Sequence, residues 1–268
     1  GLWKGIKRYD LYKEGMLPYE WQPKLQKVAT DLGLDFFSTP FDLVGVDFLE
    51  TMNMPIYKIA SFEINDIPLI RYVAKKHKPM IISTGVADLD DIQLALDTCY
   101  KEGNYDISLL KCTSEYPATY EQANLLTIPD MIHRFGIPVG VSDHTMGSLV
   151  PIVAVSLGAT IVEKHFILSR TNGGPDSAFS MEPNEFREMV DSIRNVEWAL
   201  GNVKYDITDY QRGKRRSLYA RTDIHCGDVF TDQNVGSYRP GVGLSPQYWD
   251  QIMGKTCKRE IVKGDVLR

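Results

Sequence analysis

The chain has 268 residues, of which 43% are hydrophobic and 24% are charged, and its formal net charge at pH 7 is -5. This length is ample for a large domain and a small one. The net acidity and the lack of a basic stripe argue against nucleic-acid binding, and no apolar run is long enough to predict a membrane span.

The spacing of the cysteines indicates the redox environment of the protein. The four cysteines, Cys99, Cys112, Cys226 and Cys257, are widely spaced and form no C-x-x-C pair. This spacing disfavours a structural zinc site or a disulfide framework and favours a reducing cytoplasm. We expect Cys112 to be a small buried hydrophobe rather than a nucleophile. No signal peptide opens the chain, which begins without Met, so we interpret it as part of a longer polypeptide.

From Asp35 to Leu200, short apolar runs alternate with amphipathic patterns. The predicted strands cover residues 35–38, 56–59, 80–83, 107–111, 138–141 and 160–164. The predicted helices include Asp88–Glu102, Gln122–Phe135 and Pro183–Leu200. The last helix begins at a proline and stops before Gly201, as helix signals require. This alternation predicts βαβ units around a parallel sheet.

The element count predicts the domain organisation. Six strands after a truncated start predict an α/β fold: a (β/α)₈ TIM barrel that lacks its first two βα units, over residues 1–203. An open doubly wound sheet remains the alternative. Residues 204–214 are polar and aperiodic, which is typical of a linker. Residues 215–268 repeat a Gly-Asp turn between short apolar runs, which predicts a small β-rich module that covers something else.

Two histidines close apolar runs that we interpret as buried strands. His144 ends one run, and His165 occupies the same place one βα unit later. The carboxyl ends of parallel strands meet at one edge of the sheet, where barrels and open α/β folds carry out their chemistry. Neutral imidazole is the commonest metal ligand, so the pair predicts a shared divalent metal ion.

The other predicted strand ends are also polar. They carry Ser38–Thr39, Lys58 with Ser61 and Glu63, Ser83–Thr84, Lys111 with Thr113 and Ser114, Ser142–Asp143, and Glu163–Lys164. Hydroxyls, lysines and backbone amides at one mouth predict an oxyanion site, with phosphate as the usual occupant.

Two carboxylates are candidate catalytic or substrate-binding groups beside that site. Glu63 is the only one expected among the phosphate binders, either as a general acid or base or as an ion-pair partner of Lys58. Asp176, in the loop after the His165 strand, either closes a turn or holds substrate hydroxyls or a metal-bound water. The residues predict a metal-assisted reaction between a phosphate-bearing substrate and a carbonyl compound, as in aldolases and phosphoenolpyruvate-condensing enzymes.

A family resemblance extends through nearly the whole chain. Its segments are Phe37–Phe41, Tyr57–Glu63, Ile82–Gly85, Lys111–Pro117, Gly140–Thr145, Glu163–Phe166 and Gly174–Met181. Over these segments the chain resembles the sialic acid synthase family, which condenses phosphoenolpyruvate with an amino-sugar aldehyde. Ser217–Ala220 and Tyr238–Gly241 are similar to the antifreeze-like (SAF) domain of that family.

Some segments are most similar to the pseudaminic acid synthase branch. They are Gly1–Trp3, Leu11–Tyr12, Pro18–Trp21 and Lys58–Glu63. The N-acetylneuraminate branch typically has Gly-Ser-Gly-Glu in place of Ala60–Glu63. The resemblance implies 2,4-diacetamido-2,4,6-trideoxy-L-altrose as the acceptor, with N-acetylneuraminate or legionaminate synthesis as the alternative.

The resemblance also implies roles for individual residues. Around phosphoenolpyruvate it places Thr39, Lys58, Ser61, Ser83, Ser114, Tyr116 and Ser142. It implies that His144 and His165 hold Mn²⁺ or Mg²⁺, that Glu63 handles protons or stabilises the tetrahedral intermediate, and that Asp176 holds the sugar. Arg239 would reach the substrate from the partner subunit of a domain-swapped homodimer.

One departure from the family supports rival interpretations. The first two βα units of the family, with their own catalytic residues, are absent from this chain. An inactive sugar-binding fragment is therefore one alternative. A metal-dependent aldolase that releases no phosphate is another, although it would leave the SAF module without a purpose.

Overall fold

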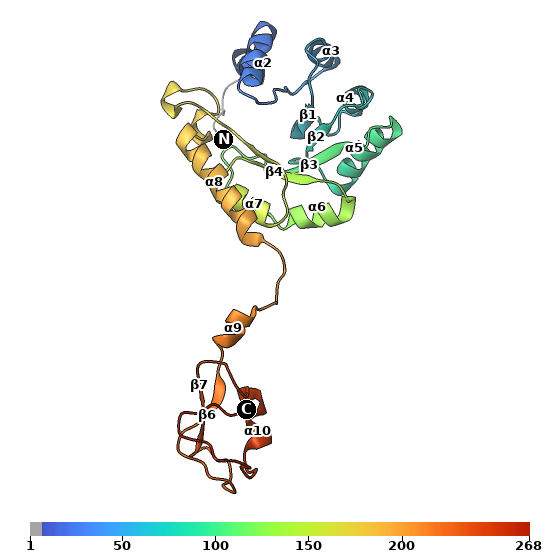
Figure 1. Ribbon diagram of the computed structural model, residues 1–268. Coiled ribbons are helices and arrows are strands. Elements are labelled where there is room, and N and C mark those ends of the chain that lie inside the picture. Colours follow the sequence, from blue (N-terminus) through green and yellow to red (C-terminus); the bar gives the residue numbers. More distant parts are fainter. Residues whose placement is uncertain (1–6) are drawn as a thin grey trace. The chain divides into compact units, whose positions relative to one another are not determined.

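The computed structural model describes residues 7–268 and divides into two compact units, one ending at Gly201 and the other spanning Asn202–Arg268 (Figure 1). The segment Gly1–Trp3, which contributes to the resemblance, lies outside the described residues.

The first unit is built on one parallel sheet. Its strands are β1 (Tyr57–Ile59), β2 (Met80–Ser83), β3 (Ile107–Cys112), β4 (Val139–Asp143) and β5 (Val162–Lys164). Each strand pairs in parallel with the next one along the chain, in the order β1-β2-β3-β4-β5. The strands are short and largely apolar, as expected where helices cover a parallel sheet.

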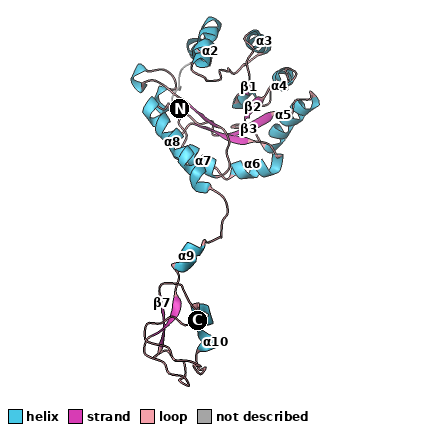
Figure 2. Cartoon of the chain, viewed as in Figure 1, coloured by secondary structure: helices cyan, strands magenta, loops and turns pink. Residues whose placement is uncertain are grey.

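In the described part of the first unit, three α-helices precede β1 and one follows each of the five strands. They are α1 (Arg8–Gly15), α2 (Gln22–Asp31), α3 (Leu43–Thr51), α4 (Ile67–Ala74), α5 (Leu89–Lys101), α6 (Thr127–Phe135), α7 (Leu149–Ser156) and α8 (Pro183–Leu200). Helices α4 to α8 form an arc on the outside of the curved sheet (Figures 1 and 2). The consecutive strand order and the helices on one side identify part of a TIM barrel rather than a doubly wound sheet.

Local signals determine where the best-predicted helices begin. At α8, Glu182 and Glu185 form a capping box around Pro183, and Gly201 follows the last residue with φ +48°. At α5, Asp88 and Asp91 form the same arrangement. These side chains satisfy amide groups that have no partner within the helix.

The core lies between the strands and their helices. Tyr57, Ile59, Ile82, Leu109 and Val139 are fully buried and belong to one hydrophobic cluster. A smaller cluster of Met181, Met189 and Ile193 joins α8 to α7 and β5. This packing holds the carboxyl ends of β1 to β5 at a common edge.

Two predicted elements are wrong in detail. Residues 35–38 form no strand, and within residues 7–268 no other segment pairs with the outer edge of β1, so no hydrogen-bonded ladder forms there. Past β5, pairing continues as a single parallel bridge between Phe166 and Met181. Helix α6 begins at Thr127 rather than Gln122, because Asn124 has φ +44° and a right-handed helix cannot continue through it.

The second unit begins with α9 (Asp209–Gly213), inside the segment predicted as a linker. It continues with β6 (Ser217–Ala220), β7 (Val235–Tyr238) and α10 (Trp249–Ile252), and β6 and β7 are antiparallel. The two Gly-Asp repeats pair with each other, because Ile224 and Ile261 exchange both backbone hydrogen bonds at 2.9 Å. Over the described part of the chain, no helix is long and apolar enough to cross a membrane.

Candidate active site

Four strand ends deliver a connected group of polar side chains. The buried Lys58 ammonium donates to Ser83 Oγ at 2.7 Å and lies 3.4 Å from Glu163 Oε2. The buried Ser142 hydroxyl donates to the other Glu163 oxygen at 2.6 Å. These residues come from β1, β2, β4 and β5, so the sheet edge brings the predicted phosphate binders together.

The structure corrects the assignment of the carboxylate in this group. Glu163, at the end of β5, pairs with Lys58, whereas Glu63 was expected to be the only carboxylate there. Glu63 lies on the 3₁₀ turn Ser61–Glu63, half-buried, and its Oε2 has no hydrogen-bond partner within the described residues. Burial raises the pKa of Glu63, although the nearby Lys58 charge opposes that rise.

A matched substitution tests the burial of Glu63. A raised pKa means that the folded state disfavours the carboxylate, so Glu63 lowers stability once the pH rises above its ordinary value of 4.5. Replacing Glu63 with Gln is expected to raise Tm at neutral pH, and the gain should vanish below pH 4.5. Thermal unfolding of both proteins between about pH 4 and pH 8 measures this. Glu115 is exposed, so Glu115→Gln is the control and should leave Tm nearly unchanged. A gain in Tm of Glu63→Gln that grows toward low pH would contradict the raised pKa of Glu63.

Ser61 and Ser114 lie together beneath the turn after β2. The Gly85 amide donates to Ser61 Oγ at 3.1 Å, and Ser114 Oγ is 3.6 Å from Cys112 Sγ. A Cβ on Gly85 would lie 2.2 Å from Ser114 Oγ, so a larger residue there would displace the Ser114 side chain.

Cys112 takes part in this polar cluster, although its sequence position indicated only a small apolar filler. Burial disfavours its thiolate, but hydrogen bonds with His144 and with neighbouring serines outweigh this, and the pKa of Cys112 is lowered to about 7. The sequence signal that could have identified it is its position between Lys111 and Thr113 at the end of a strand.

The two histidines lie side by side, with ring centroids 5.1 Å apart. His144 is buried, and its Nδ1 is 2.7 Å from the backbone oxygen of Thr113. Nδ1 of the half-buried His165 is 3.5 Å from Asp176 Oδ2. The Tyr116 ring packs on His144 at 4.2 Å, and Phe179 packs on His165 at 4.9 Å.

The pKa values of the two histidines are shifted in opposite directions, downward for His165 and upward for His144. Burial and the charge of His144 lower the pKa of His165, which favours the form that binds metals. Burial also disfavours the His144 cation, but Cys112 and the Thr113 carbonyl raise its pKa overall. Burial raises the pKa of Tyr116 to about 12, so its phenol stays protonated.

The donor set of the pair fits a divalent ion. Nδ1 of each ring faces a protein oxygen, at 2.7 Å in His144 and 3.5 Å in His165, so an ion would be bound through Nε2, where in His144 it would compete with the hydrogen bond to Cys112. In the described part of the chain, no group of three or more His, Cys, Asp or Glu side chains is arranged to hold a metal. Two imidazoles would therefore leave open positions for substrate oxygens.

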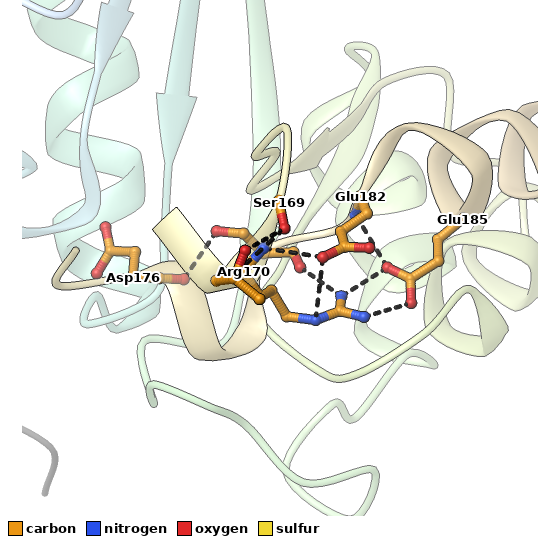
Figure 3. Close-up of polar contacts among 7 residues, drawn as sticks. Ser169, Arg170, Asp176, Glu182 and Glu185 are labelled. Carbon is orange, nitrogen blue, oxygen red and sulfur yellow. Dashed lines mark hydrogen bonds and ion pairs between the residues drawn. The ribbon is translucent and has the colours of Figure 1, made fainter. Parts of the chain in front are cut away.

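The loop that carries Asp176 is anchored to α8. The Arg170 guanidinium makes two hydrogen bonds with Glu185, at 2.7 and 2.8 Å, and a third with the Ser180 carbonyl at 3.0 Å (Figure 3). The Ser180 hydroxyl in turn donates to the Asp176 carbonyl at 2.7 Å. This network holds Asp176 close to His165 despite the exposure of the loop.

Thr39 and Arg239 are the remaining predicted site residues. Thr39 is half-buried ahead of α3 and makes no side-chain hydrogen bond among the described residues. Arg239 lies in the second unit, where it lines a pocket with Tyr219, Arg221, Tyr238 and Lys263.

Comparisons with known proteins show the family of both units. The NeuB family model matches residues 2–205, and the SAF domain model matches residues 215–268. The chain is 41% identical to a pseudaminic acid synthase of Campylobacter jejuni over 271 residues, which covers 100% of the chain and 79% of that relative. A pseudaminic acid synthase of Helicobacter pylori is 42% identical over 262 residues, covering 96% of the chain and 77% of the relative.

A solved structure supports the same family. The N-acetylneuraminic acid synthetase of Leptospira borgpetersenii superposes with a TM-score of 0.72 at 30% identity, over 78% of this chain and 74% of that one. The chain therefore belongs to the NeuB family, the sialic acid synthases, in which it resembles pseudaminic acid synthases and carries a SAF domain.

Proposed function

We propose that the chain condenses phosphoenolpyruvate with 2,4-diacetamido-2,4,6-trideoxy-L-altrose to give pseudaminic acid and phosphate. One observation carries the proposal: the predicted phosphate binders and the histidine pair form one connected group at the edge of the sheet. Cys112 links them, because it forms hydrogen bonds with both Ser142 and His144. The acceptor is inferred from 41–42% identity to two pseudaminic acid synthases, against 36–37% to two N,N'-diacetyllegionaminic acid synthases and 37% to an N-acetylneuraminate-9-phosphate synthase.

In this proposal, Lys58, Ser83 and Ser142 hold the phosphate of phosphoenolpyruvate, because one ammonium and two hydroxyls provide donors for its oxygens. Ser61, Ser114, Tyr116 and Thr39 complete the predicted cradle. The cradle orients C3 of phosphoenolpyruvate toward the aldehyde carbon, so that the carbon–carbon bond forms between positioned reactants. Water then adds at C2, and phosphate leaves by cleavage of the C–O bond.

A divalent ion, Mn²⁺ or Mg²⁺, held by His144 and His165, would supply Lewis-acid polarisation of the aldehyde. Asp176 lies beside His165 and would accept hydrogen bonds from the sugar hydroxyls. Glu63 has a raised pKa, and we assign it to proton transfer or to stabilisation of the tetrahedral intermediate.

Release of inorganic phosphate tests the proposal. The protein is incubated with phosphoenolpyruvate, Mn²⁺ and either the altrose derivative or N-acetylmannosamine. Release with the altrose derivative alone supports pseudaminate synthesis. Release only with N-acetylmannosamine keeps the family and changes the acceptor, and legionaminate precursors extend the same assay. A condensation product formed without phosphate release would identify an aldolase. No product and no phosphate release with any acceptor would favour a sugar-binding protein without activity.

Replacing Arg239 with Ala is expected to raise the KM for the sugar by about 10-fold or more, through the loss of one charge-assisted hydrogen bond. The KM for phosphoenolpyruvate should change little, since Arg239 is proposed to contact the sugar alone. Initial rates with each substrate varied in turn measure the two constants. Arg259→Ala, in the same unit, is the control, and equal changes in both constants would exclude contact with the sugar.

A domain-swapped homodimer is the proposed assembly, because Arg239 would then reach the substrate bound by the partner subunit. Sedimentation equilibrium of the protein is expected to give twice the chain mass. A monomer at all concentrations tested would count against the swap. The cytoplasm is the proposed location, and the four free cysteines support a reducing environment.

A further inference from the structure

A buried ion pair joins the two residues that immediately precede the histidines. Lys164 Nζ is 2.5 Å from Asp143 Oδ2, and both side chains are only 1% exposed. Asp143 and Lys164 are also register partners where β4 and β5 end. Each precedes a histidine of the proposed metal site, Asp143 before His144 and Lys164 before His165.

Thr145 joins the same cluster from the far side of His144. Its amide donates to Asp143 Oδ1 at 2.9 Å, and its hydroxyl donates to Asp143 Oδ2 at 3.1 Å. Lys164 Nζ donates in turn to the Thr145 carbonyl. The two sequence neighbours of His144, Asp143 and Thr145, therefore bind each other. Both also bind Lys164, the residue before His165.

The β5 strand needs such an anchor. It has three residues, each half-buried as a whole although the Lys164 side chain is buried, whereas the five residues of β4 are all buried. Its ladder joins it to β4, and a single bridge, Phe166 to Met181, continues the pairing beyond it. A slip of one residue along β5 would turn the His165 side chain to the opposite face of the sheet.

A buried ion pair is a poor way to gain stability, because removing both ions from water offsets most of their attraction. Its clearest benefit is a defined register, since each charge must meet its partner. Here the register it defines is that of the two strand ends that carry the histidines.

We propose that Asp143, Lys164 and Thr145 are positioning residues that hold the two imidazoles at the separation needed to share one divalent ion. The inference rests on the proposed metal site and deepens it. None of the three residues needs to contact the ion, because they act through the backbone on either side of His144 and before His165.

The test measures Mn²⁺ affinity directly, by electron paramagnetic resonance of free Mn²⁺, without turnover. In the variant Asp143→Asn/Lys164→Met both charges are removed together, so no unpaired charge is left buried and the fold is expected to persist. Mn²⁺ binding should weaken by about 10- to 100-fold, the range for residues that orient metal ligands. Tm should fall by no more than a few degrees.

Two controls separate positioning from general stability. Glu50→Gln/Lys78→Met removes a second ion pair of the same unit, whose atoms are 2.8 Å apart, and should leave Mn²⁺ affinity unchanged. Thr145→Val removes only the hydroxyl donor and should weaken binding, while Thr145→Ser should restore it. If the double variant does not fold, the Thr145 pair alone decides the question.

The proposal is overturned if a folded double variant, or Thr145→Val, binds Mn²⁺ as tightly as the parent protein. It is also overturned if the Glu50/Lys78 control loses as much affinity. A parent protein that binds no Mn²⁺ would defeat the metal site and the positioning role together. Phosphate release by the parent is assayed separately, so failure of the positioning role is distinguishable from failure of the condensation.

Discussion

Replacing His144 with Ala is expected to reduce metal-dependent phosphate release at least about 1000-fold, because a Lewis acid supplies several kcal/mol to the transition state. His165→Ala should have a similar effect, since two ligands hold the proposed ion. The fold should survive, because the lost Nδ1 hydrogen bond to Thr113 contributes only about 1 kcal/mol. Initial rates at saturating Mn²⁺, with circular dichroism of each variant, provide the measurement.

The chain offers a matched control for this result. His133 is exposed on α6, and His133→Ala should keep the parent rate. If His144→Ala and His165→Ala were folded and remained active at saturating Mn²⁺, the two imidazoles could not be the essential metal ligands.

Replacing Lys58 with Met is expected to raise the KM for phosphoenolpyruvate by about 10- to 100-fold, since a charge-assisted hydrogen bond is worth about 1.5–3 kcal/mol. Methionine keeps the unbranched shape of this buried side chain, so the fold should tolerate the change. The Glu163 carboxylate, with its side chain 43% exposed, can be hydrated when it loses its partner. Rates at varied phosphoenolpyruvate and saturating sugar measure the effect.

Lys78→Met is the control for removing a paired lysine, because Lys78 binds Glu50 rather than the strand-end group. A KM for phosphoenolpyruvate that is unchanged in Lys58→Met would remove Lys58 from the phosphate cradle. A rise confined to the KM for the sugar would move Lys58 to the acceptor side of the site.

Much of the fold could be predicted, because the signals are local. The apolar runs of β1 to β5 and the capping residues of α5 and α8 lie within a few residues of the elements they determine. The alternation predicted a parallel sheet, and the structure confirms part of a TIM barrel followed by a small β module. The strand at residues 35–38 was wrong, because a strand needs a ladder as well as an apolar run.

The histidine pair could be predicted for a related reason. His144 and His165 each end a strand, and consecutive strands of a βαβ unit are usually neighbours, so two local patterns implied one site. Their closeness, with centroids 5.1 Å apart, agrees with that prediction. Their proposed role as metal ligands stays a prediction until Mn²⁺ binding is measured.

The sequence by itself thus determined the five paired strands, the helices α5 and α8, and the polar residues at the strand ends. Only the tertiary structure decided which of those residues meet. It paired Lys58 with Glu163 instead of Glu63, placed Cys112 among polar groups, and buried the Asp143–Lys164 pair between the ends of β4 and β5. The reason is physical: these contacts join residues on different strands, and they depend on strand register and side-chain direction, which no single run of sequence records.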